Sequence, residues 1–156
     1  MKKILIALDY DPSAQKVAEA GYEIAKSMGA ETTLLHILTD PIYYSSIEYS
    51  PITGYTGFTD TTQAQMDSIE SLNKASQHFL DHIKIHLDDN DIQTIVKEGD
   101  LGDTILKVAK KMHADVIVMG SHSRRWLENI VIGSVTEKVL HLCTKPLFII
   151  PTKKQN

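Results

Sequence analysis

Five short runs of apolar residues recur along the chain, and within each run the apolar positions are continuous rather than alternating with polar ones. The runs are Ile4–Leu8, Thr32–Ile37, Ile92–Val96, Asp115–Met119 and Pro146–Ile150. Continuous apolar runs of this length are typical of strands buried on both faces, as in a parallel sheet. The pattern therefore predicts five buried strands.

The segments between these runs have the apolar spacing of amphipathic helices. The first predicted helix spans Pro12–Met28, with Asp11 as its N-cap and Gly29 after its end. The other predicted helices span Thr61 to Leu87, Asp103 to His113, and Ser134 to about Cys143, where Ser134 and Glu137 have capping-box spacing. Strands alternating with helices predict an α/β fold, a doubly wound five-stranded parallel sheet with helices on both faces. The length of 156 residues suits one domain, spanning residues 1–156.

One long segment, Leu38–Asp60, has neither the continuous apolar run of a buried strand nor the apolar spacing of an amphipathic helix. It carries five aromatic residues: Tyr43, Tyr44, Tyr49, Tyr55 and Phe58. A structureless segment of this length is unusual in a compact domain. Two interpretations are open: a mobile insertion, or a lid or partner surface near a ligand.

Composition narrows the function classes. The net charge is −4 and no run of Lys or Arg occurs, which argues against a nucleic-acid partner. No apolar stretch approaches the roughly 18 residues that a membrane span needs. The single cysteine, Cys143, excludes an intrachain disulfide and is interpreted as a small core residue. We therefore expect a cytoplasmic protein with no membrane partner.

The segment from Gly120 to Thr136 is the richest in candidate chemistry. A glycine ends a buried strand, a small polar loop follows, and Gly133 precedes a well-capped helix. The unpaired amides at such a helix start, together with the helix dipole, favour an anion. Gly133 allows close approach of the backbone, and Ser134 and Thr136 offer hydroxyl donors. The alternative is structural: two turn glycines and a serine that only caps its helix.

The same segment resembles a known motif. It reads Gly120, two residues, Ser123, nine residues, then Gly133-Ser134, and this is similar to the Gly-x2-Gly-x9-Gly-Ser/Thr phosphate motif of ATP-binding universal stress proteins. The resemblance extends over essentially the whole chain in the right order. Its other matching segments are Lys3–Ile6 leading to Asp9, Leu35-His36, Met119–His122, Gly133–Glu137 and Lys145–Leu147.

The resemblance implies an ATP site, possibly with Mg²⁺, and implies roles for particular residues. Asp9 and Ala7 would lie near the ribose and adenine, Ile37 would meet the adenine edge through its backbone, and Gly120 would lie by the ribose and α-phosphate. The phosphates would be surrounded by His122, Ser123, Gly133, Ser134, Val135 and Thr136. No metal-ligating residue and no catalytic residue is predicted.

Ser123 departs from the motif, which has glycine there. If the position needs a positive φ, serine costs about 1–2 kcal/mol. Alternatively, its hydroxyl donates to the ligand. The departure leaves a second interpretation open, a dimeric scaffold of the same family that does not bind ATP.

Other classes of protein fit less well. The chain has neither the Gly-x4-Gly-Lys-Ser/Thr loop of phosphate-transferring enzymes nor the Gly-x-Ser-x-Gly turn of hydrolases. A flavodoxin-like carrier would need a hydroxyl- and glycine-rich phosphate loop after the first strand, and the loop here is Asp9-Tyr10-Asp11-Pro12. We therefore expect an ATP-binding stress-response regulator rather than an enzyme, with at most very slow hydrolysis.

Several further side chains could be structural or could contact a ligand or metal. Asp9 either contacts the ligand or orients the first helix. His36 is interpreted as a hydrogen-bonded interior histidine. His78, His82 and His86 recur every four residues, either as a solvated stripe or as metal ligands.

We expect the strand order 3-2-1-4-5. Asp9 and Gly120 would then face one crevice at the point where the strand order reverses. The last strand, Pro146–Ile150, would lie at an edge, where an exposed apolar strand favours pairing. Two-fold pairing with its own copy would give a homodimer, as the family resemblance also implies.

Overall fold

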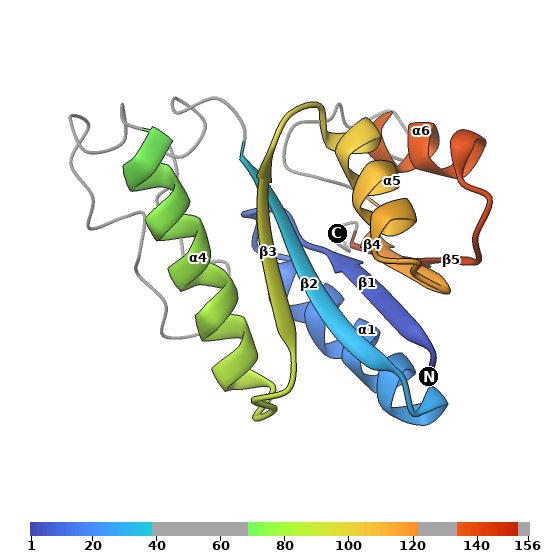
Figure 1. The fold of residues 1–156 in the computed structure, drawn as a ribbon, viewed down its shortest axis with the longest axis horizontal. Coiled ribbons are helices and arrows are strands. Elements are labelled where there is room, and N and C mark those ends of the chain that lie inside the picture. The colour runs from blue at the N-terminus through green and yellow to red at the C-terminus, as the bar shows by residue number, and fades with distance from the viewer. Residues whose placement is uncertain (39–68, 122–133, 153–156) are drawn as a thin grey trace, which may run out of the picture.

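A five-stranded parallel sheet forms the centre of the molecule (Figure 1). The computed structural model describes residues 1–38, 69–121 and 134–152. The strands are β1 (Lys3–Ala7), β2 (Glu31–Leu38), β3 (Gln93–Glu98), β4 (Val116–Gly120) and β5 (Leu147–Ile150). Their order is β3-β2-β1-β4-β5 and every neighbouring pair is parallel. The predicted topology is confirmed, and each strand begins and ends within two residues of its predicted bounds.

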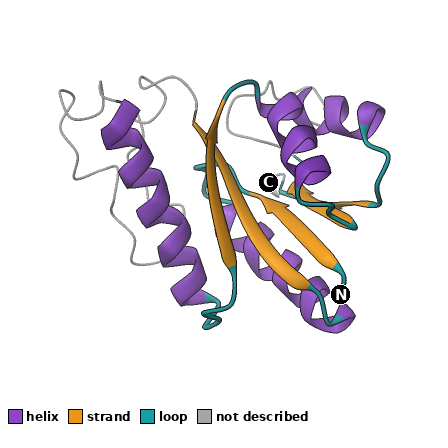
Figure 2. Ribbon diagram, viewed as in Figure 1, coloured by secondary structure: helices purple, strands orange, loops and turns teal. Residues whose placement is uncertain are grey.

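Helices cover both faces of the sheet, as predicted (Figure 2). They are α1 (Ala14–Met28), α4 (Ile69–His86), α5 (Leu101–Lys111) and α6 (Ser134–Leu142). Apolar residues of α1 and α4 pack with one face of β1, β2 and β4, and those of α5 and α6 pack with the other. Residues 61–68 of the second predicted helix and residues 39–60 of the long aromatic segment lie outside the described residues.

The predicted start of α1 is wrong by two residues. The helix begins at Ala14, with Ser13 rather than Asp11 at the N-cap position. The Asp11 carboxylate accepts the Ser13 amide at 2.9 Å, and the Asp11 carbonyl accepts the Ala14 amide at 2.9 Å. An aspartate that binds backbone two residues ahead forms a turn, and this turn competes with the first helical residues.

The bounds of α5 also differ from the predicted ones. The helix begins at Leu101 rather than Asp103, because the Asp100 carboxylate caps it by accepting the Asp103 amide at 3.0 Å. It ends before His113, which has a φ of 57° in the left-handed region that terminates helices. The last helix, α6, ends one residue before the predicted Cys143.

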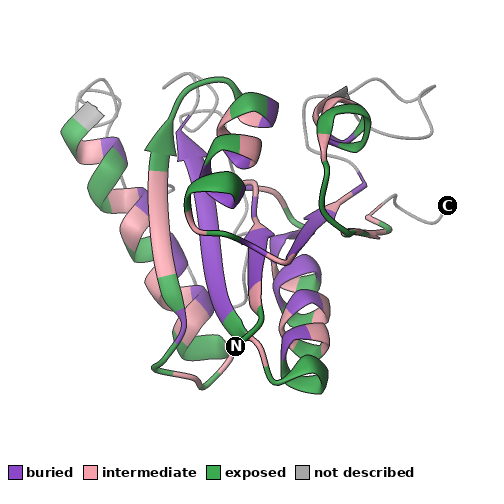
Figure 3. Cartoon of the chain, turned by 45° about the vertical axis from the view of Figure 1, so that its right-hand side comes forward, coloured by how far each residue is buried: buried purple, intermediate pink, exposed green. Residues whose placement is uncertain are grey.

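The strands differ in burial according to their place in the sheet (Figure 3). Every residue of β2 after Glu31 is buried, whereas the edge strands β3 and β5 contain no fully buried residue. Along β1, Ile4 and Ile6 contribute to one core while Leu5 contributes to the other. A strand with core on both sides needs apolar residues at successive positions, which explains the continuous runs.

The core under α1 and α4 contains a buried aromatic group. The ring of Phe79 on α4 meets the rings of Tyr10 and His36 edge-on, with centroids 5.1 and 5.5 Å away. His36 Nδ1 lies 2.9 Å from the Leu8 carbonyl, and burial lowers the pKa of His36 to about 4. The prediction of a hydrogen-bonded interior histidine is confirmed, and at neutral pH this histidine is uncharged.

Helix α1 lies close to the sheet at Gly21. A Cβ atom at that position would lie 2.8 Å from Ile6 Cδ1 and 3.2 Å from Val118 Cγ1. Real Cβ atoms do not approach so closely, so the glycine is what allows this helix to lie so near β1 and β4.

Candidate functional site

A pocket opens at the carboxyl ends of β1, β2 and β4, beside the starts of α1, α5 and α6. It lies where the strand order reverses between β1 and β4, which is where open α/β sheets bind ligands. Its lining is Ala7, Leu8, Asp9, Ser13, Ala14, Val17, Leu35, Ile37, Leu101, Ile105, Met119, Gly120, Val135 and Thr136.

Six of the ten predicted site residues meet in this pocket, although they come from four separate parts of the chain. They are Ala7, Asp9, Ile37, Gly120, Val135 and Thr136. Of the other four, His122, Ser123 and Gly133 lie outside the described residues. Ser134 is the first residue of α6, and its side chain is also outside the described part.

The prediction missed the apolar walls of the pocket. Leu35 lies two residues before Ile37 on β2, so the period of two along a strand would have placed both on one face. Leu101 and Ile105 reach the pocket from α5, and their spacing of four residues marks one helix face. Nothing local in the sequence indicates which strand ends this helix face approaches.

Asp9 follows β1 and lies at the pocket rim. Beyond the end of β1, the Leu8 amide still donates to the Leu35 carbonyl at 2.8 Å, so β2 continues to hold the chain. The Asp9 carboxylate accepts the Tyr10 amide at 3.0 Å. The carboxylate therefore orders the turn before α1 while it lines the pocket.

Ile37 continues β2 past the end of β1. The β1–β2 register ends at the pair Ala7 and Leu35, and the Leu35 carbonyl points toward β1. Main-chain groups two residues apart on a strand point the same way. The Ile37 amide and carbonyl are therefore directed to the β1 side of β2, and Ile37 is one of the residues that line the pocket.

Thr136 ties the first turn of α6 to the end of β4. Its buried hydroxyl donates to the Gly120 carbonyl at 2.8 Å, across sixteen positions of sequence. This hydroxyl proton is thus engaged within the protein, whereas the sequence suggested a donor to the ligand. The hydrogen bond holds the start of α6 beside the pocket, and the first amides of a helix have no partner within the helix.

The histidine stripe on α4 lies away from this pocket. His86 Nε2 lies 2.8 Å from Glu19 Oε1, and this contact lowers the pKa of the Glu19 carboxyl. Within residues 1–38, 69–121 and 134–152, no group of three His, Cys, Asp or Glu side chains is arranged to hold a metal ion.

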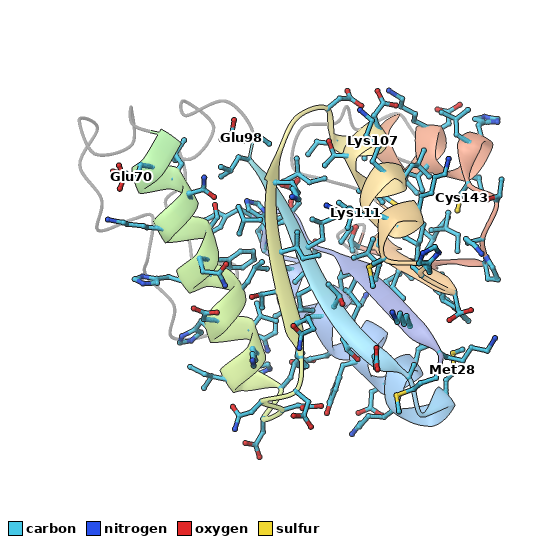
Figure 4. All side chains as sticks on the ribbon, viewed as in Figure 1. Met28, Glu70, Glu98, Lys107, Lys111 and Cys143 are labelled. Atoms are coloured by element: carbon cyan, nitrogen blue, oxygen red, sulfur yellow. The ribbon has the colours of Figure 1, made fainter. Side chains whose placement is uncertain are left out.

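Cys143 lies just beyond α6 (Figure 4). It is half-buried against the core under α5 and α6, and its thiol donates to the Lys145 carbonyl at 3.2 Å. Its packing matches the small core residue predicted, although it lies at the edge of that core. None of the described helices is both long enough and apolar enough to cross a membrane.

Comparison with known proteins bears on the whole chain. The family model described as "Universal stress protein family" matches residues 1–151. The chain belongs to this family. It is 28% identical over 156 residues to universal stress protein MJ0577 of Methanocaldococcus jannaschii, covering 97% of this chain and 96% of that protein.

Solved structures of universal stress proteins share the fold. The structure of MJ0577 aligns with a TM-score of 0.72 at 25% identity, covering 99% of this chain and 98% of the other. A universal stress protein in complex with cAMP aligns with a TM-score of 0.65 at 16% identity, covering 97% and 98%. One from Archaeoglobus fulgidus in complex with dAMP aligns with a TM-score of 0.60 at 19% identity, covering 96% and 98%.

Proposed function

We propose that this universal stress protein binds ATP in the pocket at the ends of β1, β2 and β4, as a regulatory ligand. One observation carries the proposal: six residues assigned to an ATP site from sequence line a single pocket at the switch point of the sheet. These residues are distant in sequence, so their meeting in one place depends on the fold.

The pocket chemistry suits an adenine nucleoside. Leu35, Ile105 and Met119 give apolar walls, which an aromatic base needs. Asp9 offers carboxylate oxygens as acceptors for ribose hydroxyls. The main chain of Ile37 is directed to the same side and suits the polar edge of the base.

The start of α6 suits the phosphates. Its first turn is fixed to β4 through Thr136, and the first amides of a helix have no partner within the helix. The binding of cAMP and of dAMP by two relatives of the same fold supports a nucleotide in this family. We expect any Mg²⁺ to be held largely by phosphate oxygens.

We further propose that ATP is retained rather than turned over quickly. Ser13 and Thr136 line the pocket, and both hydroxyls are engaged, Ser13 with Asp11 and Thr136 with Gly120. No Lys, Arg or His is among the described residues that line the pocket, so none of them supplies a positive charge to the transferred phosphoryl group. Hydrolysis would therefore be very slow, and the bound nucleotide would act by occupying the pocket.

We also propose a homodimer formed through β5. This strand pairs with β4 on one side and is the edge of the sheet, and its Phe148 side chain is 44% exposed. Pairing with a second copy would cover this edge. Sedimentation should show a dimer at micromolar concentration and a monomer for Phe148→Asp; a monomeric wild type would contradict the proposal.

The nucleotide proposal is tested by identifying any released ligand by its mass and then by measuring ATP binding with calorimetry. The purified protein is denatured, and any nucleotide in the supernatant is identified by mass. Asp9→Ala should weaken ATP binding by about 1–3 kcal/mol because one polar contact is lost. Glu23→Ala, which removes an exposed carboxylate from the far part of α1, is the matched control and should bind like the wild type.

Ser123→Gly separates ATP binding from the alternative of a scaffold without nucleotide. Tighter binding by the variant would mean that Ser123 strains the loop, and weaker binding would mean that its hydroxyl contacts phosphate. Absence of ATP, ADP and AMP binding in both the wild type and Ser123→Gly would contradict the proposed function and leave the dimeric scaffold.

A further inference from the structure

Lys138 joins the two helices that frame the phosphate end of the pocket. It lies one turn after Ser134 on α6, and its ammonium lies 3.0 Å from Asp100 Oδ2 and 3.1 Å from Asp103 Oδ1. Both carboxylates belong to the start of α5, where Asp100 also caps the helix through the Asp103 amide. One lysine thus bridges two acidic groups across the α5–α6 contact.

The stem of the same lysine packs tightly as well. A Cβ atom at Gly102 would lie 2.9 Å from Lys138 Cδ and 3.3 Å from its Cγ. The lysine therefore crosses α5 at the one residue of that turn without a side chain. The ammonium and the stem therefore make separate contacts with α5.

The partners of Lys138 keep it charged. The Asp103 amide and the Lys138 ammonium hold the pKa of the Asp100 carboxyl below its usual value, and the two carboxylates raise the pKa of Lys138. The side chains of Lys138, Asp100 and Asp103 are 40%, 58% and 50% exposed. Ion pairs at this exposure contribute little to the stability of a whole domain, so their geometric effect is of more interest.

The first turn of α6 is held from two directions. Thr136 ties it to the end of β4, and Lys138 ties it to the start of α5. Val135, the residue before Thr136, lines the pocket together with Leu101 of α5. A turn held by one anchor can pivot about it, whereas a second anchor on another element fixes its direction.

We propose that Lys138 is a positioning residue for phosphate binding: by bridging Asp100 and Asp103 it aims the α6 amides at the pocket and strengthens binding of nucleotides over nucleosides. This inference rests on the proposed nucleotide function. The base and ribose contacts come from the strand ends and from Ile105 of α5, and none of them is on α6, the helix that this bridge orients.

The test compares ATP with adenosine in calorimetric titrations. Lys138→Met keeps most of the stem and removes the charge, and it should raise the Kd for ATP about threefold to fivefold. The Kd for adenosine should change by less than about twofold, because adenosine has no phosphate to place at α6. Lys138→Arg keeps the charge and can bridge two carboxylates, so it should restore the wild-type ratio of the two Kd values.

A matched control excludes a general effect of charge. Lys107 is an exposed lysine on α5, labelled in Figure 4, and Lys107→Met removes the same charge from the same region. It should leave the ATP-to-adenosine ratio unchanged. Asp100→Asn with Asp103→Asn keeps an oxygen at the cap, should weaken ATP binding as Lys138→Met does, and should add little when combined with it.

Hydrogen exchange gives a readout that needs no nucleotide. In the ligand-free protein, the amides of Lys138–Leu140, which bond to the carbonyls of the first turn of α6, should exchange faster in Lys138→Met than in the wild type or Lys138→Arg. An unchanged ATP-to-adenosine ratio in Lys138→Met, or an equal change in Lys107→Met, would overturn the inference while the nucleotide function stands. A wild type that binds neither ATP nor adenosine would overturn both.

Discussion

The cores on the two faces of the sheet contain different kinds of side chain. Under α1 and α4, Tyr10, His36 and Phe79 are all buried and their rings meet edge-on. Under α5 and α6 the core is aliphatic, and at the carboxyl end of the strands it gives way to the pocket.

The two faces also differ in how their helices are attached. Gly21 lets α1 lie directly against β-branched side chains of the sheet, which are stiff. At Gly102, α5 is met instead by a half-exposed lysine stem from α6. We therefore expect the aromatic core of the α1/α4 face to contribute more to stability, and the α5/α6 face to hold two of the helix starts that border the pocket.

The largest expected effect comes from the aromatic group. Phe79→Ala should lower the free energy of unfolding by about 3–5 kcal/mol, because it removes a large buried ring from a packed core. Val135→Ala, on the pocket side, should cost about 1 kcal/mol because the side chain is only partly buried. Urea unfolding measures both. Equal losses for the two variants would contradict the proposed division between the faces.

The second effect is a pH dependence that belongs to the α1/α4 face. Above pH 6.5 His36 is neutral in both the folded and the unfolded protein. Between pH 6.5 and about 4 the unfolded chain binds a proton that the folded protein does not. The free energy of unfolding therefore decreases as the pH is lowered through this range, by about 3 kcal/mol in total. Below pH 4 both forms are protonated and this loss stops.

His36→Asn tests this pH dependence. Asparagine does not titrate, and its amide can still donate to the Leu8 carbonyl that His36 contacts. Urea unfolding at pH 7 and at pH 4.5 should show a smaller difference in stability for the variant than for the wild type. A difference as large as that of the wild type would mean that other groups govern the acid sensitivity.

The smallest expected changes in stability come from alanine substitutions at two glycines, Gly21 and Gly102. Gly21→Ala should destabilise the fold by about 1 kcal/mol, since crowding against Ile6 and Val118 outweighs the better helix propensity of alanine. Gly102→Ala should change the stability by less than about 0.5 kcal/mol, because the lysine stem can move into solvent. Thermal unfolding of both variants measures the contrast, and the reverse order would show that α5 and α6 are packed as rigidly as α1.

Much of the fold was predictable because the apolar runs record burial on both faces of each strand. Ile4, Leu5 and Ile6 point alternately into two cores, so all three must be apolar, and the run is visible without any alignment. Helix starts were harder to predict. Asp11 and Asp100 are both good caps, but the first forms a turn with Ser13 and the second begins a helix directly.

The candidate site was predictable where chemistry is local and not where it depends on packing. Asp9 and Gly120 follow strands, and the ends of parallel strands meet at one edge of the sheet, so both could be placed in one pocket. The engagement of the Thr136 hydroxyl by Gly120 and the bridge from Lys138 to Asp100 join residues 16 and 38 positions apart. No spacing rule in the sequence connects such pairs.

The bond between Thr136 and Gly120 has a consequence for how this protein can evolve. It holds the end of β4 and the start of α6 together, so the two ends of the segment between them are joined by a hydrogen bond. Doubling the length of a loop whose ends are already joined costs only about 0.6 kcal/mol. We therefore expect changes in the length of that segment to cost the fold little, so that relatives can differ there while the sheet and its helices are retained.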